Sequence, residues 1–351
     1  MNEMARKSES GFQVLARLGA RPDISRLDTI LFPDGLSQRQ VIELFGGEGT
    51  GKTEMLMYLI VRCILPKTWN GLHIGGLGIG VVFLDTDYHF SILRLATILE
   101  THLTKAVQQN NAMKCENNTL KNDTIKFNTN QENENLHDAN GDKITGITNQ
   151  TGLTEEQIET FVKSCFQRLH VIRCNTSTQL VVTVHSLESL LGNHPDIGVL
   201  MLDSVSAFYW IDRNSGGDNV ATQENNQRHL VRALDKLINE YNLVLFATKQ
   251  MIFVKRQKQD QDNDSTPGGY HTPKGGSTNY DEIDHCEFMC KQWQTLVSDR
   301  WIFSRHEMKQ VQKINSRSYI FRVLQTSRVK PKGHVTFGID DSGIVDMQIV
   351  T

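Results

Sequence analysis

The sequence lacks long apolar runs, paired cysteines and a large net charge, and each absence argues against a class of protein. The N-terminal residues through Glu9 are polar and charged, so we expect no signal peptide, no membrane span and an intracellular location. A formal net charge of −3 gives no global attraction to polyanions, and any nucleic-acid contact must depend on local basic groups. The six cysteines include no C-x-x-C pair, which favours a reducing compartment. His285, Cys286 and Cys290 lie close in sequence, but no second ligand pair is spaced for zinc.

The chain has 351 residues, enough to bury a substantial core. Residues 1–40 are expected to form a short helix, over Ser10–Leu18, and a linker broken by Pro22 and Pro33. This leaves no room for a separate N-terminal domain before the first core strand at Val41. We therefore predict one core over residues 41–350.

A glycine-rich motif follows the apolar run Val41–Phe45 and precedes a helical apolar pattern over Glu54–Leu65. It fits G-x-x-x-x-G-K-[ST] in the context of strand, loop and helix, which is typical of a phosphate-binding loop. Glycines let several backbone N–H groups turn toward one point, where the helix N-terminus adds partial positive charge. Lys52 would reach the β- and γ-phosphates, and Thr53 would ligate Mg²⁺. The expected nucleotide-binding residues are Gly46, Gly47, Glu48, Gly49, Thr50, Gly51, Lys52 and Thr53.

Two further apolar runs end in acids. Val81–Leu84 leads into Asp85, Thr86 and Asp87, and Val199–Leu202 leads into Asp203. Acids at the carboxyl ends of buried parallel strands are where α/β sheets place their chemistry. Asp203 is predicted to hold Mg²⁺ or its water shell.

Gln250 follows a third apolar run, Leu243–Thr248. Its amide either contacts a terminal phosphate or satisfies the end of the strand; from the residue alone the second interpretation is favoured.

Strands alternate with helices in the middle of the chain, and four strand-like segments close it. This order predicts an α/β fold, with a mostly parallel central sheet flanked by helices and with C-terminal antiparallel strands. The predicted C-terminal strands are Arg300–Arg305, Ser318–Gln325, Val335–Ile339 and Ile344–Val350.

Two segments interrupt the core. Residues 106–152 are rich in Asn, Glu, Lys, Asp and Thr and poor in spaced apolar residues, so a disordered insertion is predicted. Residues 255–284 contain Pro-Gly-Gly and Gly-Gly and are expected to form a mobile loop. The basic start of this loop, Lys255–Lys258, is interpreted as solvated surface, with phosphate contact or nuclear import as alternatives.

Four stretches, GGEGTGKTEM, FLDTDYHFSILRLATILE, LMLDSVSAFYWIDR and LVLFATKQ, occur in order. Together they resemble the RecA-type strand-exchange family, in particular its eukaryotic recombinase paralogues. The resemblance implies a RecA-type P-loop ATPase core that binds ATP and Mg²⁺ through Lys52, Thr53 and Asp203. Asp87 stands where active members carry a glutamate that polarises the attacking water. Gln250 matches the γ-phosphate sensor.

The resemblance also implies a function and partners. Such proteins assemble with other recombinase paralogues in the nucleus and support homologous-recombination repair of DNA breaks and crosslinks, assisting recombinase assembly on single-stranded DNA. Asp212–Asp218 and Lys255–Asp284 match the two loops that line single-stranded DNA. Both are poor in net positive charge, so weak intrinsic DNA binding is expected.

The remaining question is whether ATP is only bound or also hydrolysed. Asp87 is one methylene shorter than glutamate, which favours an ATP-binding subunit with at most weak DNA-dependent ATPase activity. The alternative is an active DNA-dependent ATPase that remodels recombinase filaments. A phosphotransferase is disfavoured, because no acceptor-binding lid or Arg-rich segment is visible.

Overall fold

The computed structural model describes residues 19–125, 153–215, 220–251, 287–307, 319–327 and 331–350, together with residues 10, 11 and 14. Most of the predicted helix Ser10–Leu18 and the whole predicted loop 255–284 lie outside these residues.

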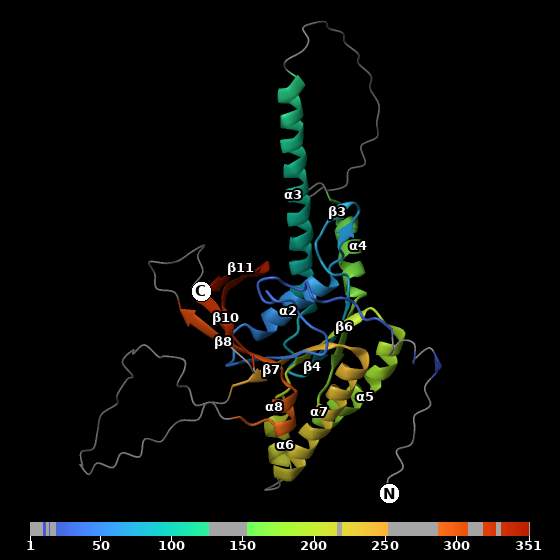
Figure 1. Ribbon diagram of the computed structural model, residues 1–351, viewed down its shortest axis with the longest axis vertical. Coiled ribbons are helices and arrows are strands. Elements are labelled where there is room, and N and C mark those ends of the chain that lie inside the picture. Colours follow the sequence, from blue (N-terminus) through green and yellow to red (C-terminus); the bar gives the residue numbers. More distant parts are fainter. Residues whose placement is uncertain are drawn as a thin grey trace, which may run out of the picture.

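The elements follow the predicted alternation of strand and helix (Figure 1). The strands are β1 (Val41–Gly46), β2 (Thr68–Trp69), β3 (Leu72–His73), β4 (Gly80–Asp85), β5 (Leu169–Arg173), β6 (Ile197–Asp203), β7 (Val244–Gln250), β8 (Asp299–Glu307), β9 (Tyr319–Ser327), β10 (Pro331–Asp340) and β11 (Gly343–Val350). The helices are α2 (Lys52–Ile64), α3 (Ile92–Ile125), α4 (Glu155–Phe166), α5 (Ser177–Asn193), α6 (Tyr209–Ser215), α7 (Val220–Tyr241) and α8 (Lys291–Leu296).

Nine of the described strands form one sheet in the order β11-β10-β9-β8-β1-β7-β6-β4-β5. Neighbouring strands run parallel from β8 through β1, β7, β6 and β4 to β5. From β8 to β11, each strand pairs antiparallel with the next one in the chain. The predicted parallel sheet with C-terminal antiparallel strands is thus confirmed. This strand order places β1 at the centre of the sheet, so the loop after β1 lies at the carboxyl end of the central strand.

The parallel part of the sheet is buried on both faces because successive side chains point to opposite sides. In β4, Val81 and Phe83 pack with α2, α3 and α4, whereas Val82 and Leu84 pack with α5, α7 and α8. The same alternation in β7 sends Phe246 to the first face and Ala247 to the second. Two hydrophobic cores therefore lie on either side of one sheet.

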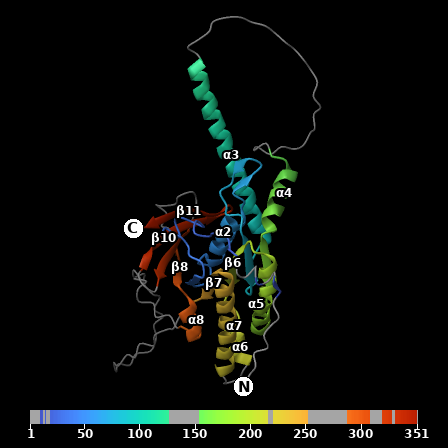
Figure 2. The ribbon, with the colours of Figure 1, turned by 45° about the vertical axis from the view of Figure 1, so that its right-hand side comes forward.

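Helix α3 corrects part of one prediction. The helix begins at Ile92 and continues to Ile125, into the segment predicted to be a disordered insertion from residue 106. It projects beyond the rest of the described structure in both views (Figures 1 and 2). Among the helix residues up to 112, whose burial is described, Leu103 and Val107 are the last buried apolar ones. The sequence has no glycine or proline between residues 92 and 125, so nothing stops the helix at the edge of the core.

Residues 126–152 of the predicted insertion lie outside the described residues. Among the described helices, none combines the length and the apolar character that a membrane span requires.

Candidate functional site

The carboxyl ends of β1, β4, β6 and β7 meet at one edge of the sheet and surround a pocket of about 390 Å³. Most of the predicted site residues line this pocket, although they are up to about two hundred positions apart in sequence. The lining residues are Glu48, Gly49, Thr50, Gly51, Lys52, Thr53, Glu54, Asp87, His89, Asp203, Ser204, Thr248, Gln250, Phe321 and Ile339. The predicted Gly46 is the last residue of β1, and Gly47 follows it, immediately before Glu48.

The loop between β1 and α2 needs glycine at specific positions. Gly49 and Gly51 have φ values of +66° and +90°, which L side chains rarely adopt. A Cβ on Gly46 would lie 2.8 Å from the carbonyl oxygen of Phe303. Gly51 immediately precedes the first residue of α2. The loop thus turns sharply into a helix N-terminus, the geometry that binds phosphate.

Lys52 lies inside this loop. Its Nζ donates hydrogen bonds to the carbonyl oxygens of Gly46, at 3.0 Å, and Gly47, at 2.6 Å. Burial lowers the pKa of Lys52 to about 8, although Asp203, Asp87 and Glu48 act in the opposite direction. The ammonium group is therefore poorly compensated, and an anionic phosphate in the pocket would stabilise its charged form.

Thr53 and Asp203 are brought together as predicted. The Thr53 hydroxyl donates to Asp203 Oδ2 at 2.8 Å, and the Thr248 hydroxyl donates to Oδ1. Burial raises the pKa of the Asp203 carboxyl, although both hydroxyls favour its charged form. A hydroxyl and a buried carboxylate beside a phosphate loop are oxygen ligands of the type that Mg²⁺ takes. The residues thus fit the cation that usually accompanies a nucleotide.

Asp87 is held at the pocket by its backbone. The N–H groups of Thr86 and Asp87 donate to the carbonyl oxygen of Asp203, at 2.8 and 3.1 Å, and the Asp87 side chain is half-buried. The Gln250 side chain is exposed, while its backbone N–H donates to the Ser206 hydroxyl at 3.0 Å. Both side chains line the same pocket as Lys52.

Sequence reasoning missed six residues that line this pocket, namely Glu54, His89, Ser204, Thr248, Phe321 and Ile339. Thr248 binds Asp203 from the neighbouring strand, and Phe321 and Ile339 form an apolar wall. A Cβ on Gly51 would meet their side-chain atoms at 3.3 and 3.2 Å. Thr248 could have been predicted, because it is a polar residue at the end of the apolar run that precedes Gln250. Phe321 and Ile339 come from strands whose position over the loop no local pattern predicts.

A buried charge cluster lies on the other face of the sheet. Glu43 and Lys249 have no exposed side-chain surface and lie 3.6 Å apart. Lys249 Nζ contacts Glu287 at 2.6 Å, and Arg300 contacts Glu43 at 2.5 Å and Glu287 at 2.9 Å. Trp293 donates to Glu43 at 2.6 Å. These contacts fix Glu287, the first residue described after residue 251, beside the end of β7.

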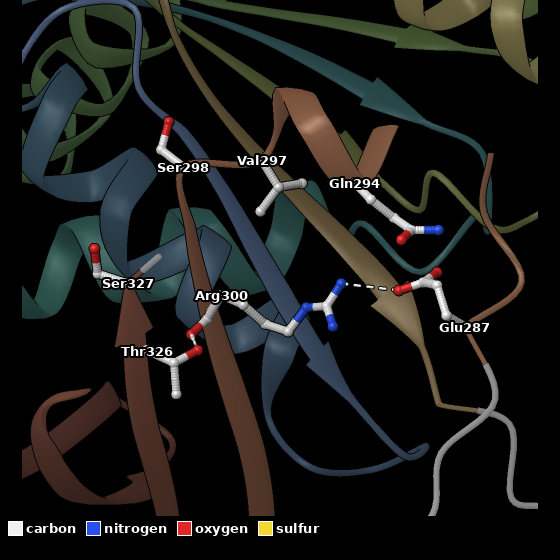
Figure 3. Close-up of a pocket in the computed structure, with 7 residues that line it drawn as sticks. All are labelled: Glu287, Gln294, Val297, Ser298, Arg300, Thr326 and Ser327. Atoms are coloured by element: carbon white, nitrogen blue, oxygen red, sulfur yellow. Dashed lines mark hydrogen bonds and ion pairs between the residues drawn. The ribbon is translucent and has the colours of Figure 1, made fainter. Parts of the chain in front are cut away.

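A second pocket, of about 380 Å³, opens beside this cluster. Figure 3 shows the Arg300 guanidinium pointing across it toward the Glu287 carboxylate. The Thr326 hydroxyl donates to the backbone of Arg300 at 2.8 Å. The two charged side chains that line this pocket, Glu287 and Arg300, are thus already paired with each other.

Of the two predicted DNA loops, Asp212–Asp218 is described in part and Lys255–Asp284 lies wholly outside the described residues. Residues 216–219 and 252–286 lie outside the described residues. Asp212 is the fourth residue of α6, where Ser177 and Asn226 donate to its carboxylate at 2.9 and 3.4 Å. The zinc candidates His285 and Cys286 are also outside, and Cys290 is buried. Among the described residues, no group of three or more His, Cys, Asp and Glu side chains could hold a metal ion.

Comparison with known proteins identifies the family of the chain. The model of the Rad51 family matches residues 20–141. The chain is 35% identical over 341 residues to DNA repair protein XRCC2 of Mus musculus, covering 97% of each chain. It is 29% identical to the XRCC2 homolog of Arabidopsis thaliana over 76% of this chain and 68% of that one. DNA repair protein RAD51 homolog 3 of Cricetulus griseus is 22% identical over 65% of this chain and 50% of its own length. The chain therefore belongs to the Rad51 family of RecA-type proteins.

Proposed function

We propose that this chain is an ATP-binding subunit of a recombinase-paralogue complex in the nucleus. In this proposal the subunit supports homologous-recombination repair of DNA breaks and crosslinks by assisting recombinase assembly on single-stranded DNA. The observation that carries it is the convergence of Lys52, Thr53 and Asp203 on one pocket at the end of a phosphate loop. Its relatives support the process: XRCC2 and RAD51 homolog 3 are DNA repair proteins, and archaeal RadA is a DNA repair and recombination protein.

The nucleotide would be ATP with Mg²⁺. Lys52 would hold the β- and γ-phosphates, and Thr53 and Asp203 would hold the cation or its waters. The loop backbone and the α2 N-terminus would supply further donors. ATP binding would shape the surface that meets other paralogues, so that occupancy rather than turnover is the output.

The second candidate is a DNA-dependent ATPase that remodels recombinase filaments. The half-buried Asp87 carboxylate, in the same pocket as Lys52 and Gln250, favours it. Its Asp side chain is one methylene shorter than the glutamate of active members, and a shift of about 1 Å can cost about 100-fold in a positioned step. Binding is thus the better-supported role.

Calorimetric titration of the purified chain with Mg²⁺-ATP tests the nucleotide site. Lys52→Ala is expected to abolish measurable binding, whereas Lys105→Ala, at an exposed position of α3, leaves it unchanged. Equal affinity of the wild type and Lys52→Ala would remove the phosphate-loop assignment.

Survival of cells lacking the protein after a DNA crosslinking agent tests the biological role. Re-expressed wild type should restore survival and Lys52→Ala should not, at equal protein level. Rescue by both would make the chain an interaction subunit whose nucleotide site is dispensable. No rescue by wild type would remove the repair assignment.

A further inference from the structure

The pocket of Lys52 has few positive charges for a site that should hold a nucleotide. Apart from His89, the titratable side chains that line it are one base, Lys52, and four acids, Glu48, Glu54, Asp87 and Asp203. ATP keeps a net negative charge after it binds Mg²⁺, and like charges this close together repel each other. A second cation beside the phosphate loop would therefore strengthen nucleotide binding.

Two arginines lie near this pocket, and one of them is already engaged. Arg94 Nη2 lies 3.3 Å from Glu54 Oε2, and the same guanidinium donates to the backbone carbonyls of Asp340 and Asp341. Arg305 is exposed and forms no ion pair with an acid in the described part of the chain. Of these two arginines, Arg305 is thus the one whose charge is available to an anion.

The register of the sheet places Arg305 beside the phosphate loop. Strand β8 is parallel to β1 and pairs Phe303 with Gly46, so Arg305 lies just beyond the end of β1. A Cβ on Gly49 would lie 3.3 Å from Arg305 Nη1. Because Gly49 has no side chain, the guanidinium lies directly against the loop that should bind phosphate.

Arg305 also faces the same side of the sheet as the pocket. It pairs with Phe321 of β9, and the Phe321 ring lines the pocket. Cross-strand partners share a face of the sheet. The guanidinium carbon lies 4.8 Å from the centroid of the Tyr319 ring, a contact that supports the side chain without neutralising its charge. Both ribbon views show the C-terminal strands beside α2, which begins at the end of this loop (Figures 1 and 2).

We propose that Arg305 binds the phosphates of the nucleotide, as a second cation that the same chain supplies alongside Lys52. The inference rests on the proposed function and adds a residue to its site. A guanidinium keeps its charge at neutral pH and presents several N–H donors in one plane, which suits the oxygens of a phosphate group. Because Arg305 belongs to β8, a bound nucleotide would connect this strand to the loop after β1.

The chain offers a matched control for the charge. Arg322 is an exposed arginine of β9. It follows Phe321 in sequence and therefore points to the opposite face of the sheet, where its charge acts on His306. Replacing Arg322 removes the same charge from the same part of the sheet, but not from the phosphate loop.

The test is calorimetric titration of the purified full-length chain with Mg²⁺-ATP and with Mg²⁺-tripolyphosphate, which has no base or ribose. Arg305→Ala is expected to weaken the binding of both ligands about tenfold, and Arg305→Glu to weaken it further. Arg322→Ala should bind both ligands as the wild type does. The difference between the wild type and Arg305→Ala should shrink in about 1 M salt, because salt screens exposed charges. Equal thermal unfolding midpoints would show that the variants are folded.

Three results would overturn the role of Arg305. One is equal affinity of the wild type and Arg305→Ala for both ligands. Another is a loss confined to ATP, which would place the guanidinium at the base or the ribose. The third is an equal loss in Arg305→Ala and Arg322→Ala, which would show a general effect of charge.

The same titrations separate this inference from the proposed function. Lys52→Ala is expected to lose binding whether or not Arg305 takes part. If Lys52→Ala loses binding and Arg305→Ala does not, the role of Arg305 is wrong and the nucleotide site stands. If the wild type binds neither ligand, the nucleotide site is wrong, and the role of Arg305 with it.

Discussion

At the scale of single residues, Lys52 is the side chain whose state changes most when the pocket fills. Its ammonium group donates to the carbonyls of Gly46 and Gly47, inside the loop that should hold phosphate. To reach a phosphate it must leave these carbonyls, and it must carry a proton when it does so. Burial lowers the pKa of Lys52 to about 8, so the side chain loses this proton as the pH rises above about 8.

We expect ATP affinity to be constant below about pH 8 and to fall above it by up to about tenfold per pH unit. Phosphate raises the pKa of Lys52 in the complex, so binding takes up a proton only where the free protein has lost it. Calorimetry between pH 7 and 9.5 measures this. Lys52→Arg, whose guanidinium stays charged, should remove the dependence from whatever affinity it keeps. A flat wild-type profile would contradict the expectation.

Phe321 makes a second prediction at this scale. Its ring lines the pocket beside Gly51 and stacks on Phe337, with centroids 5.4 Å apart. The apolar wall suits a base, and the loop suits the phosphates. Phe321→Ala should weaken ATP binding about tenfold and leave tripolyphosphate binding unchanged. Ile320→Ala, on the opposite face of β9, is the control. An equal loss of affinity for ATP and for tripolyphosphate would show that the base binds elsewhere.

The residues of the site differ in how far sequence predicts them. Lys52, Thr53 and Asp203 were predicted because each belongs to a local motif whose chemistry needs that residue type. Phe321 was not, because its place depends on the register of β9 with β8 and of β8 with β1. Register is set by the pairing of distant segments, which no single stretch of sequence records.

At the scale of elements, β1 and β7 each carry a charge into a buried layer. Glu43 and Lys249 point to the face covered by α8, where Trp293 donates to Glu43. Gln250 lines the pocket of Lys52 instead. Strand alternation thus gives two neighbouring residues of β7 different surroundings. The cluster is balanced, with two acids and two bases in contact.

Removing one charge from this cluster should lower the free energy of unfolding. Glu43→Gln leaves Lys249 and Arg300 with one carboxylate between them in a buried site, and we expect a loss of about 3–5 kcal/mol in the free energy of unfolding. Urea denaturation measures it. Glu159→Gln removes an exposed ion pair with Lys163 and should cost less than about 1 kcal/mol. Similar midpoints for the two variants would show that the cluster adds little to stability.

The elements themselves were mostly predictable. Apolar runs of four to six residues predicted the parallel strands, because a strand that is buried on both faces needs apolar side chains at successive positions. The end of α3 was not predictable from composition, because a polar segment without helix breakers extends a helix that the core has already nucleated.

At the scale of the whole molecule, the proposed rate of ATP turnover depends on the residue at position 87. Steady-state ATP hydrolysis with single-stranded DNA should be well below about 1 s⁻¹, because an aspartate at position 87, one methylene shorter than glutamate, would position an attacking water less well. Asp87→Glu should raise the rate, and Asp87→Asn should lower any that remains. Turnover of about 1 s⁻¹ or more in the wild type would favour the filament-remodelling ATPase.

The length of α3 has a consequence for how the protein moves in solution. The part of the helix from Val107 to Ile125 is about 27 Å long. A rod of this kind adds friction out of proportion to its mass, so the monomer should elute early from a gel-filtration column and sediment slowly. The elution volume alone would suggest a dimer, whereas the sedimentation coefficient alone would suggest a smaller particle, and light scattering is the measurement that gives the true mass.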